Sequence, residues 1–549
     1  MDWPRHLIHR WRRLGWADWS TGAALAVIAV AAVLHSREYA GAVIDDAYIT
    51  FRHALNLVRG HGLTCNPGER IEGTSSAFYA LIMVVPIALG VDPYRAAALL
   101  GSLAFAGCSV SAYLAVRACI QDGYSRLLGV CAAALVAASP VLALHSQTGM
   151  ETLPYCCLLA WGWWLHLRAV AGGRASSAWP LVLAAAGLMR PEGFAYFLLL
   201  WTAGGLARWR RQELWSLVRV ELLPFLGVYV AWLLLRYAHF GSLVPNSVLA
   251  KSGHAARYAA LSAGPALRRL LDGPGTLLLS EYARAHVFTS LFLIGALLLR
   301  RGRYAAVLAV GFALLSGAAI AWNDGDWMPY RRLLTPALVP FAVCVALGLR
   351  GFLFHREQRS FLGHVPSLVL GGLALVAVIG VGREHPSLTH TSLVDGVRLR
   401  EMGQRLATLA RPSDRVASEE GGVLVYYWGI PAVDMYGLCD AHIARRGNPQ
   451  PLGAGRADPA YVIAKRPTFF VFDRIGRAAV YYQHPAFAPD RHAFFALRFP
   501  RDYLATYSVG GPPVLFVRKD RPNVSAVAQA LGARLVDAGE ELRRAALLH

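Results

Sequence analysis

Two adjacent carboxylates, Asp45 and Asp46, open the stretch of this sequence that is best suited to chemistry. The stretch runs to Ser76 and is too polar and too rich in glycine to cross a bilayer. A carboxylate at a fixed place can accept a proton from a reacting hydroxyl, which is the work of a general base. Asp is also a preferred N-cap residue, so one of the two could instead cap the helix that follows. A cap explains only one carboxylate, and the sequence therefore predicts a catalytic role for the pair, with Asp45 as the base.

The residues that follow Asp46 have the spacing of a short amphipathic helix. An apolar stripe and a neighbouring polar stripe recur at helical intervals, formed respectively by Tyr48, Phe51, Leu55 and Val58 and by Arg52, Asn56 and Arg59. Such a pattern is typical of a helix that lies in a membrane surface. We therefore expect this helix to lie at the lipid–water boundary and to hold the two carboxylates at a fixed depth.

Cations that could hold a phosphate lie in two later loops. Lys251 ends the segment GSLVPNSVLAK, and Arg331 and Arg332 lie side by side in NDGDWMPYRRLLTP. An ammonium attracts a phosphate as a point charge, whereas a guanidinium can grip it with two hydrogen bonds. A lysine at a membrane boundary can also extend to water without binding a ligand, and nearby carboxylates can simply neutralise the arginines. The sequence predicts phosphate binding and leaves these alternatives open.

The segment RPEG places two more charges between short apolar runs. Arg190 and Glu192 lie near membrane depth, where an unpaired charge costs about 2.5–3.5 kcal/mol or more. Arg190 is therefore a further candidate for the phosphate. An ion pair of Arg190 with Glu192 or with Glu151, in the segment HSQTGMET, is an equally good explanation.

Polar and aromatic side chains in the same loops could contact a sugar. Aromatic rings stack on sugars, although membrane interfaces use the same residue types. The candidate sugar or acceptor contacts are Asn246, Asp324, Asp326, Trp327, Tyr330 and His145, with weaker candidates at Glu419, Glu420, Asp434 and Asp440. So many carboxylates could bind a divalent metal ion, but the sequence identifies neither the ligands of such an ion nor any other cofactor.

Composition and charge placement indicate a polytopic membrane protein. Of 549 residues, 56% are hydrophobic and 16% are charged, against about 25% charged in soluble domains. The net charge of +20 does not indicate nucleic acid, because arginines cluster before the first apolar segment and in short loops between later ones. This clustering predicts a cytoplasmic N-terminus, about eleven spans and polar motifs on the outer face, provided that residues 77–89 do not cross completely.

The chain divides into a membrane part, residues 1–383, and an outer α/β domain, residues 384–549. The first outer loop is residues 39–76. In the outer domain, strands are predicted at Thr468–Phe472 and Val514–Val517, and helices at Leu393–Leu409 and Val524–Leu535. Two cysteines, Cys65 and Cys439, fall on the outer side, and a disulfide between them is left open.

Several motifs together resemble a known superfamily. In chain order they are DDAYITFR, GHGL, NPGE, EGTSS, TGMET, RPEG, GSLVPNSVLAK, NDGDWMPYRRLLTP and VDMYGLCDAHIA. The sequence resembles the GT-C membrane glycosyltransferases, and among them the AftB-type terminal arabinofuranosyltransferases of mycobacterial cell walls. The resemblance implies a mainly α-helical GT-C bundle in the cytoplasmic membrane with an extracytoplasmic active site and outer domain. It adds Glu151 as a second acidic residue of the catalytic site and favours a phosphate role for Lys251.

The resemblance also implies the substrates. The donor would be a polyprenyl-phosphate sugar, for an arabinofuranosyltransferase decaprenyl-phosphoarabinofuranose, and the acceptor a glycan such as an arabinan end. Such a donor is already activated, and the sequence has no P-loop or dinucleotide motif. Two alternatives remain: a GT-C transferase of a hexose or mannose onto polysaccharide or protein, and a lipid-linked glycan flippase. A flippase would be expected to carry charges on both faces and repeated halves, which are not visible here.

The predicted topology can be tested by cysteine labelling. A cysteine introduced at Ser216, within the Arg208–Arg219 loop, is expected to resist a membrane-impermeant thiol reagent applied to intact cells, because this loop is predicted to face the cytoplasm. The same variant should react after the cells are lysed. Reaction of Ser216→Cys in intact cells would contradict the predicted arrangement of spans.

Overall fold

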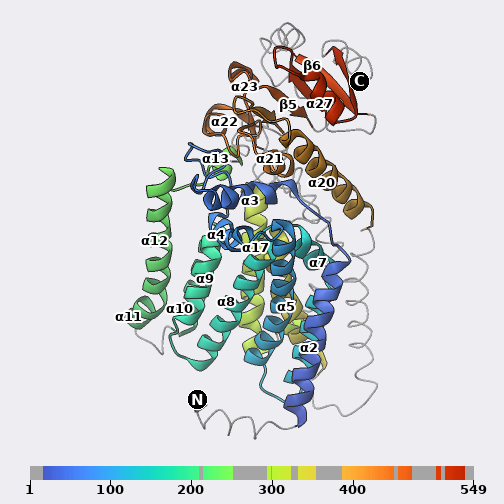
Figure 1. Ribbon diagram of the computed structural model, residues 1–549. Helices are drawn as coiled ribbons and strands as arrows, with labels where there is room; N and C mark the ends of the chain where they lie inside the picture. The colour runs from blue at the N-terminus through green and yellow to red at the C-terminus, as the bar shows by residue number, and fades with distance from the viewer. Residues whose placement is uncertain are drawn as a thin grey trace, which may run out of the picture.

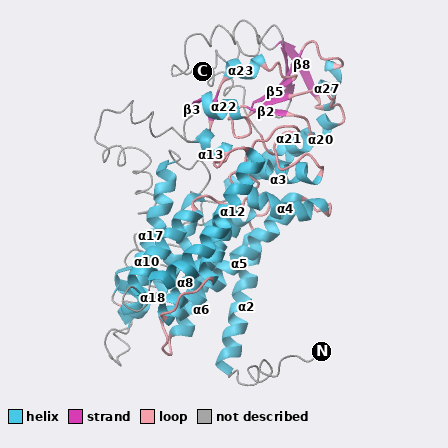
Figure 2. Cartoon of the chain, turned by 90° about the vertical axis from the view of Figure 1, so that its left-hand side faces the viewer, coloured by secondary structure: helices cyan, strands magenta, loops and turns pink. Residues whose placement is uncertain are grey.

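The structure is a computed structural model, which describes residues 16–208, 214–251, 293–297, 299–322, 332–353, 386–419, 421–449, 455–472, 503–508 and 514–537. Long helices form a bundle, and a sheet with short helices stands on one end of it (Figure 1). Seen from the side, the strands again gather at that one end (Figure 2). The described residues thus form a helical part and an α/β part, and the predicted boundary between them at residues 383–384 lies outside the described residues.

The bundle consists of apolar helices with α5 near its centre, packed against α2, α6 and α8. In chain order the helices are α2 (Trp16–Arg37), α5 (Pro93–Cys119), α6 (Ser125–Ala137), α7 (Pro140–Gln147), α8 (Thr152–Gly172), α9 (Ala178–Met189), α10 (Gly193–Arg208), α12 (Leu223–Phe240), α17 (Arg300–Trp322) and α18 (Thr335–Leu353). In the described part of the chain, five helices are long and apolar enough to span a membrane, or six if the bent pair α6–α7 is one span. The count of eleven stays a prediction, because residues 252–292 and 354–385 are outside the described ranges.

The segment whose crossing was in question forms a short helix, α4 (Ala77–Ala88). Its 12 residues rise about 18 Å, which is well short of a hydrocarbon core about 30 Å thick. It packs against α3 (Asp45–Val58) instead of running through the bundle. The length of α4 therefore supports the prediction that this segment does not cross.

A buried ion pair closes the end of the bundle opposite the sheet. Arg208 donates to both oxygens of Glu221, at 2.7 and 2.8 Å, from the end of α10 to the π-helical turn Val218–Leu222. Both side chains are almost fully buried. Arg208 was counted among the arginines that indicate topology, but it has a packing role, since removing one partner would leave an uncompensated buried charge. Arg219, by contrast, is exposed.

In the outer domain, the described residues start with helix α20 (Pro386–Ala407), which precedes a sheet with short helices. The main sheet of this domain has the strand order β2-β1-β5-β7-β6-β8. The bounds are β1 (Val416–Ser418), β2 (Ala432–Asp434), β5 (Phe469–Phe472), β6 (Tyr503–Ser508), β7 (Val514–Arg518) and β8 (Ala533–Asp537). Strand β1 pairs parallel with β2 and β5, and the other pairings are antiparallel. Short helices α21 (Val423–Trp428), α22 (Ala441–Arg446), α23 (Pro459–Ala464) and α27 (Val524–Ala530) accompany the sheet.

The predicted strands at β5 and β7 are confirmed, and so is the long helix α20. The prediction of one helix over Val524–Leu535 is wrong in its second half. Helix α27 ends at Ala530, and after a turn at Gly532 the chain pairs with β6 as the edge strand β8. Pairing with a distant strand overrides local helical periodicity here.

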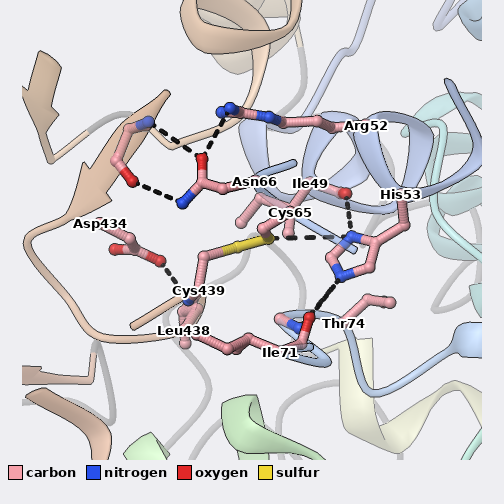
Figure 3. Close-up of a disulfide and its surroundings, with 12 residues drawn as sticks. Ile49, Arg52, His53, Cys65, Asn66, Ile71, Thr74, Asp434, Leu438 and Cys439 are labelled. Atoms are coloured by element: carbon pink, nitrogen blue, oxygen red, sulfur yellow. Dashed lines mark hydrogen bonds between the residues drawn. A yellow bond between two sulfur atoms is a disulfide. The ribbon is translucent and has the colours of Figure 1, made fainter. Parts of the chain in front are cut away.

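The first outer loop and the outer domain are joined covalently. Cys65 and Cys439, 374 residues apart in the chain, form a disulfide with a Cα–Cα distance of 6.0 Å (Figure 3). Gly73 packs against the bond so closely that a Cβ there would overlap both sulfurs. The disulfide that the sequence left open is therefore present, and it fixes the outer domain against the start of the membrane part.

Polar contacts run beside this disulfide. Arg52 of α3 donates to the Asn66 side-chain oxygen and to the Ile430 carbonyl, both at 2.9 Å. The Asn66 amide in turn exchanges two hydrogen bonds with the backbone of Ala432, at 2.9 and 3.0 Å. The first outer loop and the outer domain are thus joined by one disulfide and by side chains that form hydrogen bonds with the backbone of the outer domain.

Removal of the disulfide is expected to destabilise the protein. Loss of a native disulfide commonly costs about 2–5 kcal/mol, so Cys439→Ser should lower the thermal unfolding temperature of the purified protein by several degrees. Cys131→Ser, at a partly exposed free cysteine, is the matched control and should have little effect.

The thiols themselves give a second measurement. Cys65 and Cys439 should react with a maleimide only after reduction. Free reactive thiols at both positions in the untreated protein, together with an unchanged unfolding temperature for Cys439→Ser, would contradict this role of the bond.

Candidate active site

Asp45 is held by the outer domain and does not cap its own helix. The N-cap of α3 is Ile44, which makes no side-chain capping bond, and both carboxylates lie in the first helical turn. The two oxygens of Asp45 accept hydrogen bonds from the backbone N–H groups of Gly422 and Val423, each at 2.7 Å. The alternative that Asp45 caps the helix that follows is therefore wrong: its carboxylate binds the backbone at the start of α21.

Asp46, one of the two predicted catalytic carboxylates, lies next to Lys251, a predicted phosphate-binding cation. The Lys251 ammonium is 3.8 Å from the Asp46 carboxylate, and each side chain is about one-fifth exposed (21% and 20%). Lys251 ends the short helix α13 (Asn246–Lys251), which packs against α22 of the outer domain. A cation thus lies next to the second carboxylate, at a place that solvent can still reach.

A third carboxylate, Asp434 at the end of β2, belongs to the same group. It accepts backbone hydrogen bonds from Tyr436 and Cys439, at 2.9 and 2.8 Å, and its Cγ would be 3.8 Å from a Cβ at Gly421. Burial raises the pKa of Asp434 to about 6, with the charges of Asp440 and Asp46 acting in the same direction. The sequence offered Asp434 only as a weak contact, because a carboxylate at a strand end is usually solvated.

The environment of Asp45 places its titration close to neutrality. Burial raises its pKa to about 7, the charges of Asp46 and Asp434 add to the rise, and the N–H groups of Val423 and Gly422 oppose it. A group with this pKa can both accept and release a proton near pH 7, which suits a general base. The role of Asp45 as a general base stays a prediction, and its pKa and fixed position are properties that such a role needs.

Helix α3 lies between the bundle and the outer domain (Figure 1), and most of its side chains are buried in the protein. Its position at the lipid–water boundary stays a prediction. Arg52 and Asn56 of its polar stripe are buried, whereas Val58 of its apolar stripe is 40% exposed. Asn56 donates to the carbonyls of Thr64 and Cys65, both at 2.8 Å. Arg52 and Asn56 thus face the folded loop and the outer domain, which supply the hydrogen bonds that water would have supplied, whereas Arg59 at the end of the polar stripe is exposed.

A buried neutral histidine that sequence reasoning missed supports this arrangement. His53 accepts a hydrogen bond from the backbone N–H of Gly73 at its Nε2, which makes Nδ1 the protonated nitrogen, 2.8 Å from the Ile49 carbonyl (Figure 3). Burial lowers its pKa to about 4. His53 thus links α3 to the loop beneath the disulfide without adding a charge near the carboxylates.

The segment HSQTGMET, residues 145–152, forms a loop that packs directly on the start of α3. The Ile44 N–H donates to the Thr148 carbonyl at 3.2 Å, and Gly149 has so little room that a Cβ would be 3.1 Å from that of Ala47. Glu151 is the next residue but one, at the start of α8. The predicted second acidic residue therefore belongs to a loop that touches the carboxylate-bearing helix.

Arg190 forms both of the ion pairs that were offered as alternatives. Its guanidinium lies 3.6 Å from Glu151 and 3.5 Å from Glu192, and the Arg190 and Glu151 side chains are nearly inaccessible. A cation between two carboxylates is already compensated. Phosphate binding by Arg190 stays a prediction, and its contacts assign it at least a structural role.

Arg332 contacts the loop that contains Glu151. It begins the 3-10 turn Arg332–Leu334, and its Nη1 is 3.4 Å from the Met150 sulfur. Its buried Nε has no hydrogen-bond partner among the described residues. The other candidates of this segment, Asp324, Asp326, Trp327, Tyr330 and Arg331, lie outside the described residues, as does Glu420.

Two residues that were predicted to contact a sugar, Asn246 and His145, are buried in the protein. The Asn246 amide donates to the carbonyls of Gly437 and Leu438, both at 2.9 Å. His145 is fully buried in α7. A sugar contact by either residue stays a prediction, and the bonds of Asn246 show that it helps to seat the outer domain.

A second buried ion pair, also missed by sequence reasoning, ties the loop to the bundle. Glu72 lies 3.0 Å from Arg236 of α12, with both side chains almost fully buried. Burial raises the pKa of Glu72 to about 7, and the charge of Arg236 opposes the rise. Glu72 is the glutamate of the motif EGTSS, which lies between a charged turn and an apolar run. A glutamate at such a place could have been predicted to form a buried ion pair.

The sequence left a metal site open. Among the described residues, no three His, Cys, Asp or Glu side chains are arranged to hold a metal ion.

Comparisons with known proteins agree with this architecture. Residues 389–523 match a domain family of unknown function, DUF8728. The chain is 27% identical over 401 residues to the terminal β-(1→2)-arabinofuranosyltransferase of Mycobacterium tuberculosis. That alignment covers 64% of this chain and 61% of the relative.

Solved structures share the fold across almost the whole chain. ArnT from Cupriavidus metallidurans, bound to undecaprenyl phosphate, has a TM-score of 0.54 at 14% identity, covering 94% of this chain and 99% of ArnT. The oligosaccharyltransferase AglB from Archaeoglobus fulgidus, in complex with an inhibitory peptide and a dolichol-phosphate, has a TM-score of 0.55 at 12% identity, covering 94% and 78%. The chain therefore has the fold of the GT-C membrane glycosyltransferases, as its motifs predicted.

Proposed function

We propose that this protein transfers a sugar from a polyprenyl phosphate to the end of a glycan on the outer face of the cytoplasmic membrane. The observation that carries the proposal is the meeting of Asp45, Asp46 and Lys251 where the bundle, the first outer loop and the outer domain join. One group at this place can accept a proton, and a neighbouring cation can attract a phosphate. The fold supports the same reading, since ArnT with this fold binds undecaprenyl phosphate.

The proposed reaction forms a bond between an acceptor oxygen and the anomeric carbon of the sugar, while the bond from that carbon to the phosphate oxygen breaks. Asp45 takes the proton of the acceptor hydroxyl, which its pKa of about 7 allows in neutral solution. Lys251 stabilises the negative charge that develops on the departing phosphate, with Arg332 as a second cation. Asp46 holds the Lys251 ammonium in place by their ion pair.

Arabinofuranose is the sugar that we propose. Its support is the similarity to the mycobacterial arabinofuranosyltransferase together with the order of the motifs along the chain. The donor would then be decaprenyl-phosphoarabinofuranose and the acceptor an arabinan end. Transfer of a hexose or mannose would use the same carboxylates and cations, and would differ only in the contacts to the sugar ring.

Sugar transfer is tested with purified protein and a panel of polyprenyl-phosphate sugars carrying arabinofuranose, mannose or glucose. We expect loss of sugar from the arabinofuranosyl lipid only when an arabinan oligosaccharide is present. Consumption of another donor would correct the sugar while keeping the reaction class. Movement of an intact lipid-linked sugar across vesicles without cleavage would replace the transferase by a flippase.

Substitution of Arg332 tests the phosphate site. Loss of a charge-assisted contact to an anion costs about 1.5–3 kcal/mol, so Arg332→Ala should weaken binding of undecaprenyl phosphate about 10- to 100-fold. Binding is followed by native mass spectrometry of the purified protein titrated with the lipid. Arg219→Ala, at an exposed arginine in the predicted cytoplasmic loop, is the control and should bind normally. Equal affinity in both variants would leave Arg332 with a structural role only.

A further inference from the structure

We propose that the backbone N–H groups of Gly422 and Val423, in the outer domain, form a positioning element that fixes the Asp45 carboxylate for catalysis. This inference rests on the proposed function, in which Asp45 is the base. It makes the outer domain part of the catalytic site, because the groups that orient the base come from a segment 377 residues away in the chain.

The contacts define one orientation of the carboxylate. Gly422 donates to Oδ2 and Val423 donates to Oδ1, both at 2.7 Å, so the plane of the carboxylate is fixed at two points. Each carboxylate oxygen can accept more than one hydrogen bond, so these bonds leave capacity for an acceptor hydroxyl. The element therefore orients Asp45 without occupying it fully.

Only glycine fits at position 422. A Cβ there would lie 2.6 Å from the carbonyl carbon of Asp45 and 2.7 Å from its Cγ, far inside contact distance. At the neighbouring Gly421 the nearest atom outside the two adjacent residues, Asp434 Cγ, would lie 3.8 Å from a Cβ, which is ordinary van der Waals contact. The close approach of the backbone to Asp45 thus depends on Gly422 alone, and Gly421 provides a matched control one residue away.

Other contacts hold the positioning element in place. One turn beyond Asp45 in α3, the ring of Tyr48 packs on those of Tyr426 and Tyr427 in α21, with centroids 5.3 and 5.7 Å apart. The disulfide and the Asn66 contacts to Ala432 anchor the same domain to the same loop. The position of the two N–H groups is therefore set by several bonds besides those to Asp45.

The charges around Asp45 explain what the element does chemically. Asp46 and Asp434 face it and favour the protonated form, as burial does, while Lys251 lies beyond Asp46. Hydrogen bonds from Gly422 and Val423 favour the ionised form. Loss of these bonds would raise the pKa of Asp45 further, so a smaller fraction of the base would be ionised at neutral pH.

The test compares Gly422→Ala with Gly421→Ala in the full-length protein. Gly422→Ala should lower kcat about 100-fold, because a displacement of about 1 Å at a reacting group has an effect of that size. The KM for the donor should change little, and the rising limb of the pH–rate profile should move to higher pH. Gly421→Ala should keep kcat within about twofold and the wild-type profile.

A second variant and a second measurement guard against misfolding. Val423→Pro removes one of the two donors at the first helical position, where proline is tolerated, and should shift the profile in the same direction. Formation of the Cys65–Cys439 disulfide and the thermal unfolding temperature report whether each variant is folded. A folded Gly422→Ala enzyme with wild-type kcat and pH profile would overturn the proposal, and so would equal losses in both glycine variants.

Amide hydrogen exchange separates this inference from the proposed function. Asp45→Ala should accelerate exchange at Gly422 and Val423, whichever sugar the protein transfers and even if it transfers none. Unchanged exchange would mean that these N–H groups do not hold Asp45 in solution. Accelerated exchange in a protein inactive on every donor would keep the contact and reject the proposed function.

Discussion

The structure depends on one carboxylate, Asp45, whose two oxygens bind backbone N–H groups of the outer domain that lie 377 and 378 residues away in the chain. A buried anion is stable only where hydrogen bonds replace its water shell. Gly422 and Val423 replace it here, and their contact requires the outer domain to lie against the first turn of α3. The residue best suited to chemistry is thus also one that joins the two parts of the protein.

The same constraint explains why α3 is so polar for a buried helix. Arg52, His53 and Asn56 would each cost free energy in an apolar interior if their donors and acceptors were unpaired. The folded loop and the outer domain provide partners for all three. A disulfide then holds these partners in register, and Gly73 allows the loop to pass directly beside it. The disulfide and these hydrogen bonds together fix the position of α3, and with it the position of Asp45 and Asp46 relative to the outer domain.

Much of this arrangement could be predicted from the sequence, and the limits have physical reasons. The period-3.6 pattern predicted helix α3, and the apolar composition predicted a bundle of membrane helices, because local hydrophobicity determines such helices. The Asp46–Lys251 contact could be anticipated only through motif order, since nothing local links residues 205 positions apart. The burial of Arg52 and the exposure of Val58 could not be derived from the spacing, because a single helix shows its stripes but not what covers them. Glu72 and His53 were missed for the same reason: their partners, Arg236 and Gly73, are set by tertiary packing.

The double role of Asp45 also determines how its chemistry can be isolated. Asparagine matches aspartate in volume, but its side-chain NH2 would face one of the two backbone N–H donors, so Asn at position 45 could satisfy only Gly422 or Val423. An activity loss in that variant would combine a missing base with a disturbed contact between domains. Asp46 makes no hydrogen bond to the outer domain among those observed for the described residues, and it faces Lys251 across 3.8 Å. The two carboxylates, although adjacent in sequence, therefore have different partners: Asp45 is fixed by the backbone of the outer domain, and Asp46 pairs with Lys251, the cation that we propose binds the phosphate.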